Sequence, residues 1–468
     1  MIDISSKLSR LLKLKVVIIL SILTFCSFLV LFISFNYSSK FLIMLIIIPV
    51  LITLLLNFQI IYKIFILSLF YEFGIYYFYL STLLFPFVAL SFLINYSYKL
   101  SDIKNPILFY FTFFLISILP SYFVAISHPE SYLISYNLLA FISILFITPI
   151  VLTGLNDIKS LGVLYLGASS LNAFYLIITS IFSGKREFGF AGIMYVDLVG
   201  VGIVISYSSF LFFKKHSVLF GFITILQVLA LLFTQTRNAW ISSAVIIFLI
   251  TIYYIIKNKN FKRLNSFSLK RVLFVLSAVL IIVMVSEFIF PNIFTRISNQ
   301  KVQTTEELAV TMDFGSIATR FFIWEIAYNV FKANPIIGTG FHSFRFVSLE
   351  YSKLDPFLYS TFVYNLTPHT TILALLADTG ILGFIGFLIF MYLTIRFFKR
   401  NLDQSITREQ KIISFILFGC QIYIIISMIM TDAWLWGTLH MLWAVILGIS
   451  VFLRNDIKTT QAISSSSD

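Results

Sequence analysis

The chain has 468 residues, of which 59% are hydrophobic, 18% aromatic and only 11% charged, and its formal net charge is +13. Because a soluble domain needs about 25% charged residues to cover its surface, this composition excludes a soluble globule and indicates a polytopic membrane protein. The basic residues cluster between apolar runs, as they do in the cytoplasmic loops of membrane proteins, so the charge does not indicate a nucleic-acid partner. Cys26 and Cys420 lie inside apolar runs and imply neither a disulfide nor a metal site.

Apolar runs long enough to cross about 30 Å of hydrocarbon predict about 12–14 transmembrane helices. The predicted spans cover residues 16–35, 41–57, 60–74, 78–97, 105–124, 132–152, 160–182, 195–213, 217–234, 238–256, 272–290, 370–395, 412–431 and 434–453. Glu72 and Gly74 interrupt the pair at 60–97, where one bent or re-entrant element would serve as well. The first run follows a basic segment like a signal peptide, but no small-residue cleavage pattern comes after it, so a transmembrane helix is expected.

The distribution of lysine and arginine predicts the topology. With a cytoplasmic N-terminus, most of the 33 basic residues fall in inner loops, including the cluster at 257–271. The predicted domains are an N-terminal transmembrane bundle (1–290), a periplasmic loop domain (291–369), C-terminal transmembrane helices (370–455) and a cytoplasmic tail (456–468), of which 463–468 is expected to be disordered. The predicted fold class is therefore an all-α polytopic membrane protein with one long, partly helical periplasmic loop.

The long loop contains a predicted amphipathic helix that ends before Asn334 and Pro335. Its apolar residues recur at a spacing of three or four, at Ile317, Phe321, Trp324, Tyr328 and Phe331. Arg320 projects to the same face as Trp324, so this face is basic as well as apolar. Arg320 either binds phosphate in a functional site or extends to the headgroups from a surface helix.

Basic residues on the outer side are informative because the positive-inside tendency disfavours them there. Arg186 lies in an outer connection, and Arg237 lies in a tight outer turn, where a functional role competes with a headgroup contact. His369 stands where a helix cap is normally Ser, Thr, Asp or Asn, which favours function over a structural role. Structural roles are expected for His128, His216 and His440, and hydrogen bonding to helix backbones is expected for Asp197, Asp378 and Asp432.

The combination of these residues resembles the O-antigen ligase superfamily over roughly residues 186–391. The resemblance is carried by Arg237, by Arg320 with Trp324, by the Pro-Ile-Ile-Gly-Thr-Gly-Phe segment at 335–341, and by His369 followed by Thr-Gly-Ile-Leu-Gly at 379–383. The superfamily also contains surface-polysaccharide polymerases. It commonly has Ser-Arg-Gly and a His-Asn pair, where this chain has Thr236, Asn238 and Thr370.

The resemblance implies an inner-membrane enzyme that moves a glycan from undecaprenyl diphosphate to a sugar hydroxyl at the periplasmic face. Arg237 and Arg320 are expected to stabilise the diphosphate, and His369 is expected to deprotonate the acceptor in an inverting transfer. The remaining predicted substrate-binding residues are Arg186, Trp324, His342 and Arg345. No cofactor is expected, and no metal is expected because the chain has no Asp-x-Asp pair.

The sequence favours a polymerase, because of its many spans and its departures from the family pattern. A ligase that joins the glycan to the lipid A core is the alternative. A transporter or flippase for lipid-linked sugars is a third reading, which the absence of a clear internal repeat and the long outer loop disfavour. The expected partners are the lipid-linked donor, a glycan or lipid A-core acceptor, membrane lipids and a polysaccharide chain-length regulator.

Overall fold

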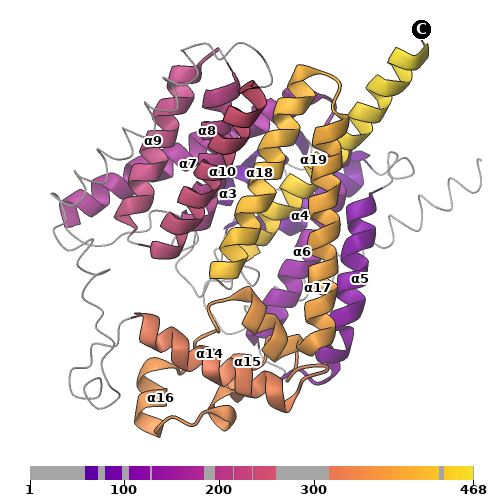
Figure 1. Cartoon of the computed structure of the whole chain (residues 1–468). Coiled ribbons are helices and arrows are strands. Elements are labelled where there is room, and N and C mark those ends of the chain that lie inside the picture. Colours follow the sequence, from indigo (N-terminus) through magenta and orange to yellow (C-terminus); the bar gives the residue numbers. More distant parts are fainter. Residues whose placement is uncertain are drawn as a thin grey trace, which may run out of the picture.

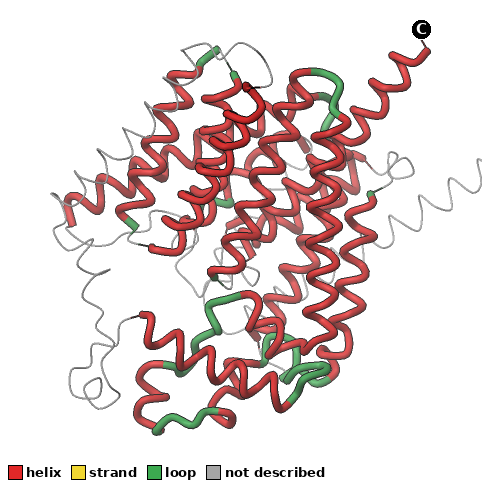
Figure 2. Tube along the Cα trace, in the orientation of Figure 1, coloured by secondary structure: helices red, strands yellow, loops and turns green. Residues whose placement is uncertain are grey.

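The computed structural model describes residues 58–71, 80–96, 105–126, 129–183, 195–213, 215–234, 236–259, 316–431 and 437–466. Throughout these residues the chain forms helices joined by loops and turns, without a strand (Figure 2). Seven of the helices are long and apolar enough to cross a membrane. The predicted class, an all-α polytopic membrane protein, is therefore confirmed.

The long apolar helices and four shorter ones form a bundle (Figure 1). The long helices are α5 (Pro106–Phe123), α6 (Pro129–Val151), α7 (Leu155–Ser183), α10 (Arg237–Lys259), α17 (Thr371–Gln404), α18 (Arg408–Met430) and α19 (Gly437–Ser466). The short ones are α3 (Phe58–Ser68), α4 (Leu80–Tyr96), α8 (Tyr195–Phe212) and α9 (Ser217–Phe233). Every predicted span within the described residues coincides with one of these helices. Those predicted at 16–35, 41–57 and 272–290 lie outside the described residues.

The ambiguous pair predicted at 60–97 contains two helices, α3 and α4, which pack against each other. The α3 helix has 11 residues and is therefore about 16 Å long. This described length is shorter than the hydrocarbon layer of about 30 Å, and the residues directly before α3 lie outside the described part of the chain.

The α19 helix lies at the centre of the bundle. Its hydrophobic segment is 89% buried, whereas that of α5 is 28% buried. The α6 helix packs along α19, and α5 packs along α17. His440 on α19 is buried beside the rings of Phe141 and Trp443 and belongs to this core, in line with the structural role expected for it.

The C-terminal end of α19 lies at the end of the bundle away from α14, α15 and α16 (Figure 1). At this end Lys159 near the start of α7 forms an ion pair with Glu409 in the first turn of α18. Gln410 of α18 donates to Asp456 of α19 at 2.8 Å. The expectation of a disordered end at 463–468 is wrong for 463–466, because α19 continues to Ser466.

Helices α14 (Ser316–Ala333), α15 (Phe344–Val347), η3 (Ser348–Tyr351) and α16 (Pro356–Phe362) lie across the opposite end of the bundle (Figure 1). We call residues 316–370 the cap. The α14 helix ends directly before Asn334 and Pro335, as predicted. The cap has its own apolar core, formed by Ile323, Ile326, Ala327, Val330, Phe344, Tyr359 and Val363 together with Ala377 of α17.

The buried side of α14 differs from the side on which Phe321 and Tyr328 recur. Its buried residues are aliphatic, whereas Phe321 and Tyr328 are 61% and 57% exposed. The helix has apolar residues on two sides, and the aliphatic side is the one that packs against Tyr359 of α16 and Ala377 of α17. The aromatic side therefore faces outward.

Candidate functional site

The end of α18 gathers the two sequence segments that carry Arg237 and His369. The last carbonyls of a helix have no partner within the helix and need donors from elsewhere. The Ile429 carbonyl accepts from Thr370 Oγ1 at 3.0 Å, and the Met430 carbonyl accepts from Asn238 Nδ2 at 2.9 Å. The next carbonyl, that of Thr431, accepts from the backbone N–H and the hydroxyl of Thr371, both at 3.0 Å. Residues 237–238 and 369–371 are thereby fixed at one place.

The α14 helix reaches the same place through two side chains. Arg320 donates through Nη1 to Asn238 Oδ1 at 3.3 Å. Trp324, one turn further along α14, donates from its indole Nε1 to the Pro368 carbonyl at 2.8 Å. Arg320 is thus bonded to the residue after Arg237, and Trp324 is bonded to the residue before His369. Three segments far apart in the chain converge on the end of α18.

Arg237 is the first residue of α10, directly after the tight turn from α9. The turn is closed by Trp240, whose indole donates to the Leu231 carbonyl at 2.8 Å. Helix N-termini present unpaired N–H groups and carry about half a positive charge, so they attract anions. The α10 N-terminus with Arg237, together with Arg320, makes the site suitable for a negatively charged group.

His369 has a left-handed backbone, with φ of 54°. Such a conformation in a residue other than glycine costs about 1–3 kcal/mol and persists only where neighbouring contacts impose it. Here the contacts are those of Pro368 and Thr370 on either side. His369 precedes Thr370, the N-cap of α17, so it is not itself the cap.

The other predicted site residues lie at different depths in the cap. Arg345 donates through NH2 to the Asn365 carbonyl at 2.8 Å and so holds the segment that leads to His369. His342 is only 5% exposed, and its ring meets Phe346 edge-on, so its side chain does not open onto the surface. Trp324 is half-buried beside Arg320. Arg186 lies outside the described residues.

The cap is joined to the bundle at a break in α17 that the sequence did not indicate. Gly380 has φ of 63° and ψ of −164°, which interrupts the helix. An uninterrupted helix would pair the N–H groups of Ile381 and Leu382 with the carbonyls of Ala377 and Asp378. All four groups are instead paired with the loop at 335–340.

At the break, each of these four backbone groups of α17 has a hydrogen-bond partner in the loop at 335–340. The Ala377 carbonyl accepts from Thr339 N at 3.0 Å, and the Asp378 carbonyl accepts from Gly340 N at 3.1 Å. Ile381 N donates to the Pro335 carbonyl at 2.9 Å, and Leu382 N donates to the Ile336 carbonyl at 3.3 Å. The two glycine-rich segments that carried the family resemblance therefore form one backbone junction.

Close approach of the two backbones explains the glycines of this junction. A Cβ atom on Gly338 would lie 2.4 Å from the Asp378 carbonyl carbon, and one on Gly380 would lie 2.3 Å from the Ile336 oxygen. The side chain of Asp378 completes the junction by accepting from the N–H groups of Ser343 and Phe344 at 3.1 and 2.8 Å. This confirms the hydrogen bonding to backbone expected for Asp378.

Asp197 has a related role beneath the site. It is buried in the first turn of α8 and accepts a hydrogen bond from the hydroxyl of Ser427 in the last turn of α18. The end of α18 is therefore held from the bundle side as well as from the cap side. Among the described residues, no group of three or more His, Cys, Asp or Glu side chains gathers as a metal site would require.

The sequence reasoning missed Asn238, Thr370 and Thr371 as residues that build the site. Asn238 and Thr370 had been noted only as departures from the family pattern. In the structure they bind adjacent carbonyls at the end of α18. Their direct proximity in sequence to Arg237 and His369 was the signal that could have identified them.

The fold defines an all-helical, multi-pass membrane protein with a helical cap at one end of its bundle, where the segments of Arg237, Arg320 and His369 meet at the end of α18. Residues 222–388 match the family described as O-Antigen ligase, and this range contains every described candidate site residue. The predicted resemblance to the O-antigen ligase superfamily is thus confirmed.

The chain is also similar to rickettsial proteins named as candidate polysaccharide ligases. It is 26% identical over 254 residues to one from Rickettsia typhi, which covers 50% of this chain and 57% of the relative. It is 29% identical over 192 residues to one from Rickettsia conorii, which covers 40% of this chain and 43% of the relative. The chain thus spans about half the length of the curated relatives it matches.

Proposed function

We propose that this chain is a glycan ligase that transfers a glycan from a polyprenyl diphosphate to a sugar hydroxyl of an acceptor lipid. The observation that carries the proposal is the convergence of the Arg237, Arg320 and His369 segments at the end of α18. Breaking the bond between a sugar and a diphosphate requires cations at the phosphates and a base at the attacking hydroxyl. The converging segments supply both kinds of group.

Arg237 and Arg320 bind the diphosphate leaving group in this proposal. A guanidinium stays ionised and holds two phosphate oxygens with its planar fork, which suits the charge that grows as the glycosidic bond breaks. The N-terminus of α10 adds to the positive potential. No metal is required in this scheme, and the two arginines take the role that a divalent cation has in metal-dependent transferases.

His369 is the general base in this proposal. Neutral imidazole accepts the proton of the acceptor hydroxyl as that oxygen attacks the anomeric carbon, and one displacement inverts the configuration there. The left-handed backbone at His369, held on both sides by hydrogen bonds, restricts the directions in which the ring can point. Such restriction favours a fixed attack geometry.

The ligase takes precedence over the polymerase that the sequence alone favoured. The family description and the relatives' names both refer to ligases, and neither refers to a polymerase. The polymerase preference depended on the span count and on the departures at Thr236, Asn238 and Thr370. Asn238 and Thr370 have contacts within the site, so these two departures give no reason to prefer a polymerase.

The proposed setting is the bacterial inner membrane, with both chain ends cytoplasmic and the cap periplasmic. The separation of the cap from the C-terminal end supports opposite sides for the two (Figure 1). The lipid A core is the proposed acceptor, and undecaprenyl diphosphate is the proposed donor lipid. A chain-length regulator would act on a polymerase and is not needed by a ligase. A transporter would have no use for a base beside two phosphate-binding arginines.

The test uses the full chain in lipid nanodiscs with an undecaprenyl-diphosphate-linked glycan and lipid A core. His369→Asn is the key variant, because asparagine accepts a left-handed backbone and cannot act as the base. His216, with φ of 61° at the other end of the bundle, provides the matched control His216→Asn. We expect at least a hundredfold loss of transfer for His369→Asn and none for His216→Asn. Equal activity of the two would remove the base assignment.

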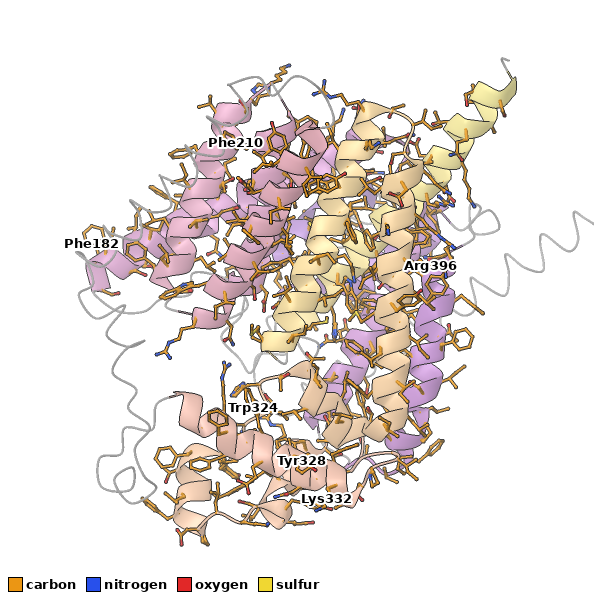
Figure 3. The ribbon with its side chains drawn as sticks, in the orientation of Figure 1. Phe182, Phe210, Trp324, Tyr328, Lys332 and Arg396 are labelled. Carbon is orange, nitrogen blue, oxygen red and sulfur yellow. The ribbon has the colours of Figure 1, made fainter. Side chains whose placement is uncertain are left out.

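The arginines are tested in the same assay. We expect Arg237→Lys and Arg320→Lys to bind the donor more weakly, because lysine keeps the charge and loses the fork. Arg396→Ala is the control, since Arg396 is an exposed arginine of α17 away from α14 (Figure 3). Donor affinity that is unchanged in both lysine variants would contradict the phosphate role.

A further inference from the structure

The outward side of α14 has a regular pattern that the proposed chemistry does not use. Phe321, Glu325, Tyr328 and Lys332 follow one another at intervals of three or four, so they form one line along the helix. All four are exposed, and the line faces away from the aliphatic side that packs into the cap core. We call these four residues the α14 stripe.

The stripe begins at the candidate site. Phe321 follows Arg320, and its ring meets that of Trp324 edge-on, with centroids 5.6 Å apart. Trp324 in turn is bonded to the residue before His369. The stripe then continues for about 16 Å along α14, with Tyr328 and Lys332 after Trp324 (Figure 3).

The chemistry of the stripe identifies its ligand class. A helix side that inserts into lipid is apolar throughout its centre, and a carboxylate there is unfavourable. Glu325 lies between the two aromatic residues of the stripe, so lipid is a poor occupant. A chain of sugars presents apolar C–H faces, which stack on aromatic rings, and hydroxyl edges, which accept from an ammonium group and donate to a carboxylate.

We propose that the α14 stripe is a glycan-binding platform, which holds sugar residues of the transferred polysaccharide beyond those at the reacting end. The proposal rests on the proposed function for the identity of the glycan, because it assigns the stripe to the same substrate. Phe321 and Tyr328 stack on sugar rings about 10 Å apart along the helix. Glu325 and Lys332 bind hydroxyl groups between and beyond them.

The test measures binding separately from transfer. The probe is surface polysaccharide of cells that express this chain, released from its lipid by mild acid and titrated onto the full chain in nanodiscs. We expect the double variant Phe321→Ala, Tyr328→Ala to bind about tenfold more weakly or worse, since two aromatic contact surfaces are lost. Phe357→Ala is the matched control, because Phe357 on α16 is 55% exposed and lies off the stripe. It should bind as the unmodified chain does.

The possible outcomes separate the two proposals. Equal glycan affinity in the double variant and the control overturns the platform. A lower melting temperature of the double variant together with weaker binding also overturns it, because the stripe would then be a folding contact. If His369→Asn binds the polysaccharide normally and transfer is absent even in the unmodified chain, the platform stands and the proposed reaction fails. Transfer that yields product only from short glycans in the double variant supports both.

Discussion

The junction between the cap and α17 depends on Gly380, and Gly380→Ala tests that dependence directly. Alanine would put a Cβ atom 2.3 Å from the Ile336 oxygen and 2.4 Å from its carbonyl carbon. These are backbone atoms of the loop that pairs with α17, so they cannot move aside without breaking those pairs. With φ of 63° at Gly380, alanine would also be strained in its own backbone.

The size of the effect follows from a count of backbone hydrogen bonds. The docked junction makes four such bonds, whereas a straight α17 would make two of its own. At about 1 kcal/mol for each bond, the docked form is favoured by about 2 kcal/mol. Alanine adds about 1–3 kcal/mol of strain to the docked form, and the contact with Ile336 adds more. The advantage of these main-chain pairs is therefore cancelled, and the junction should open much more often than in the unmodified chain.

Amide hydrogen exchange distinguishes a straightened helix from general unfolding. In Gly380→Ala we expect the N–H groups of Thr339 and Gly340 to exchange at least tenfold faster, because their acceptors return to the helix. The N–H groups of Ile381 and Leu382 should stay protected, since a straight α17 pairs them again. Transfer should fall with the loss of docking.

Gly162→Ala provides the control for this experiment. Gly162 lies within α7, and a Cβ atom there would meet no atom within 4 Å. We expect unchanged exchange at the junction and equal or slightly higher stability, because alanine favours helix. Full protection of Thr339 and Gly340 in Gly380→Ala, with normal transfer, would refute the account of the junction.

Three further predictions concern the site. Trp324→Phe removes the bond to the Pro368 carbonyl and should lower the transfer rate up to tenfold, measured as kcat with saturating donor and acceptor. An unchanged kcat would count against Trp324 as a support of His369. Asn238→Ala removes two hydrogen bonds, which are worth about 2 kcal/mol together. It should raise KM for the donor, since Arg320 loses its bond to the Asn238 side chain. A KM equal to that of the unmodified chain would show that this bond is dispensable. Transfer should survive treatment with EDTA, and a loss that magnesium or manganese restores would contradict the metal-independent scheme.

The helices of the bundle could be predicted from the sequence because the apolar runs report them directly. The end of α14 was also predictable, since Asn334 and Pro335 cannot continue a helix. The break at Gly380 was not, because one glycine inside an apolar run is compatible with an unbroken helix. What breaks this helix is the loop at 335–340, about forty residues earlier in the chain, and such a pairing leaves no local signal.

The candidate site was predictable in its residue types and not in its assembly. Arg237 stood out because arginine is disfavoured in an outer turn, and His369 stood out because the residue at that position before a helix is normally Ser, Thr, Asp or Asn. The end of α18 gave no comparable signal, since its part in the site is made by backbone carbonyls. The sequence also did not decide which side of α14 is buried, because both of its sides are apolar and only the partner surface selects one.

The cap is attached to the bundle by different kinds of bond at the loop 335–340 and at the start of α14. At α17 four main-chain hydrogen bonds join the cap to residues 377–382, whereas near the start of α14 the side chain of Arg320 donates to Asn238 of α10. Separating the start of α14 from the bundle therefore breaks fewer main-chain hydrogen bonds than separating the loop at 335–340 from α17. If the proposed function holds, the lipid-linked glycan should therefore enter beside the start of α14, while the glycine junction keeps the other side of the cap attached to α17.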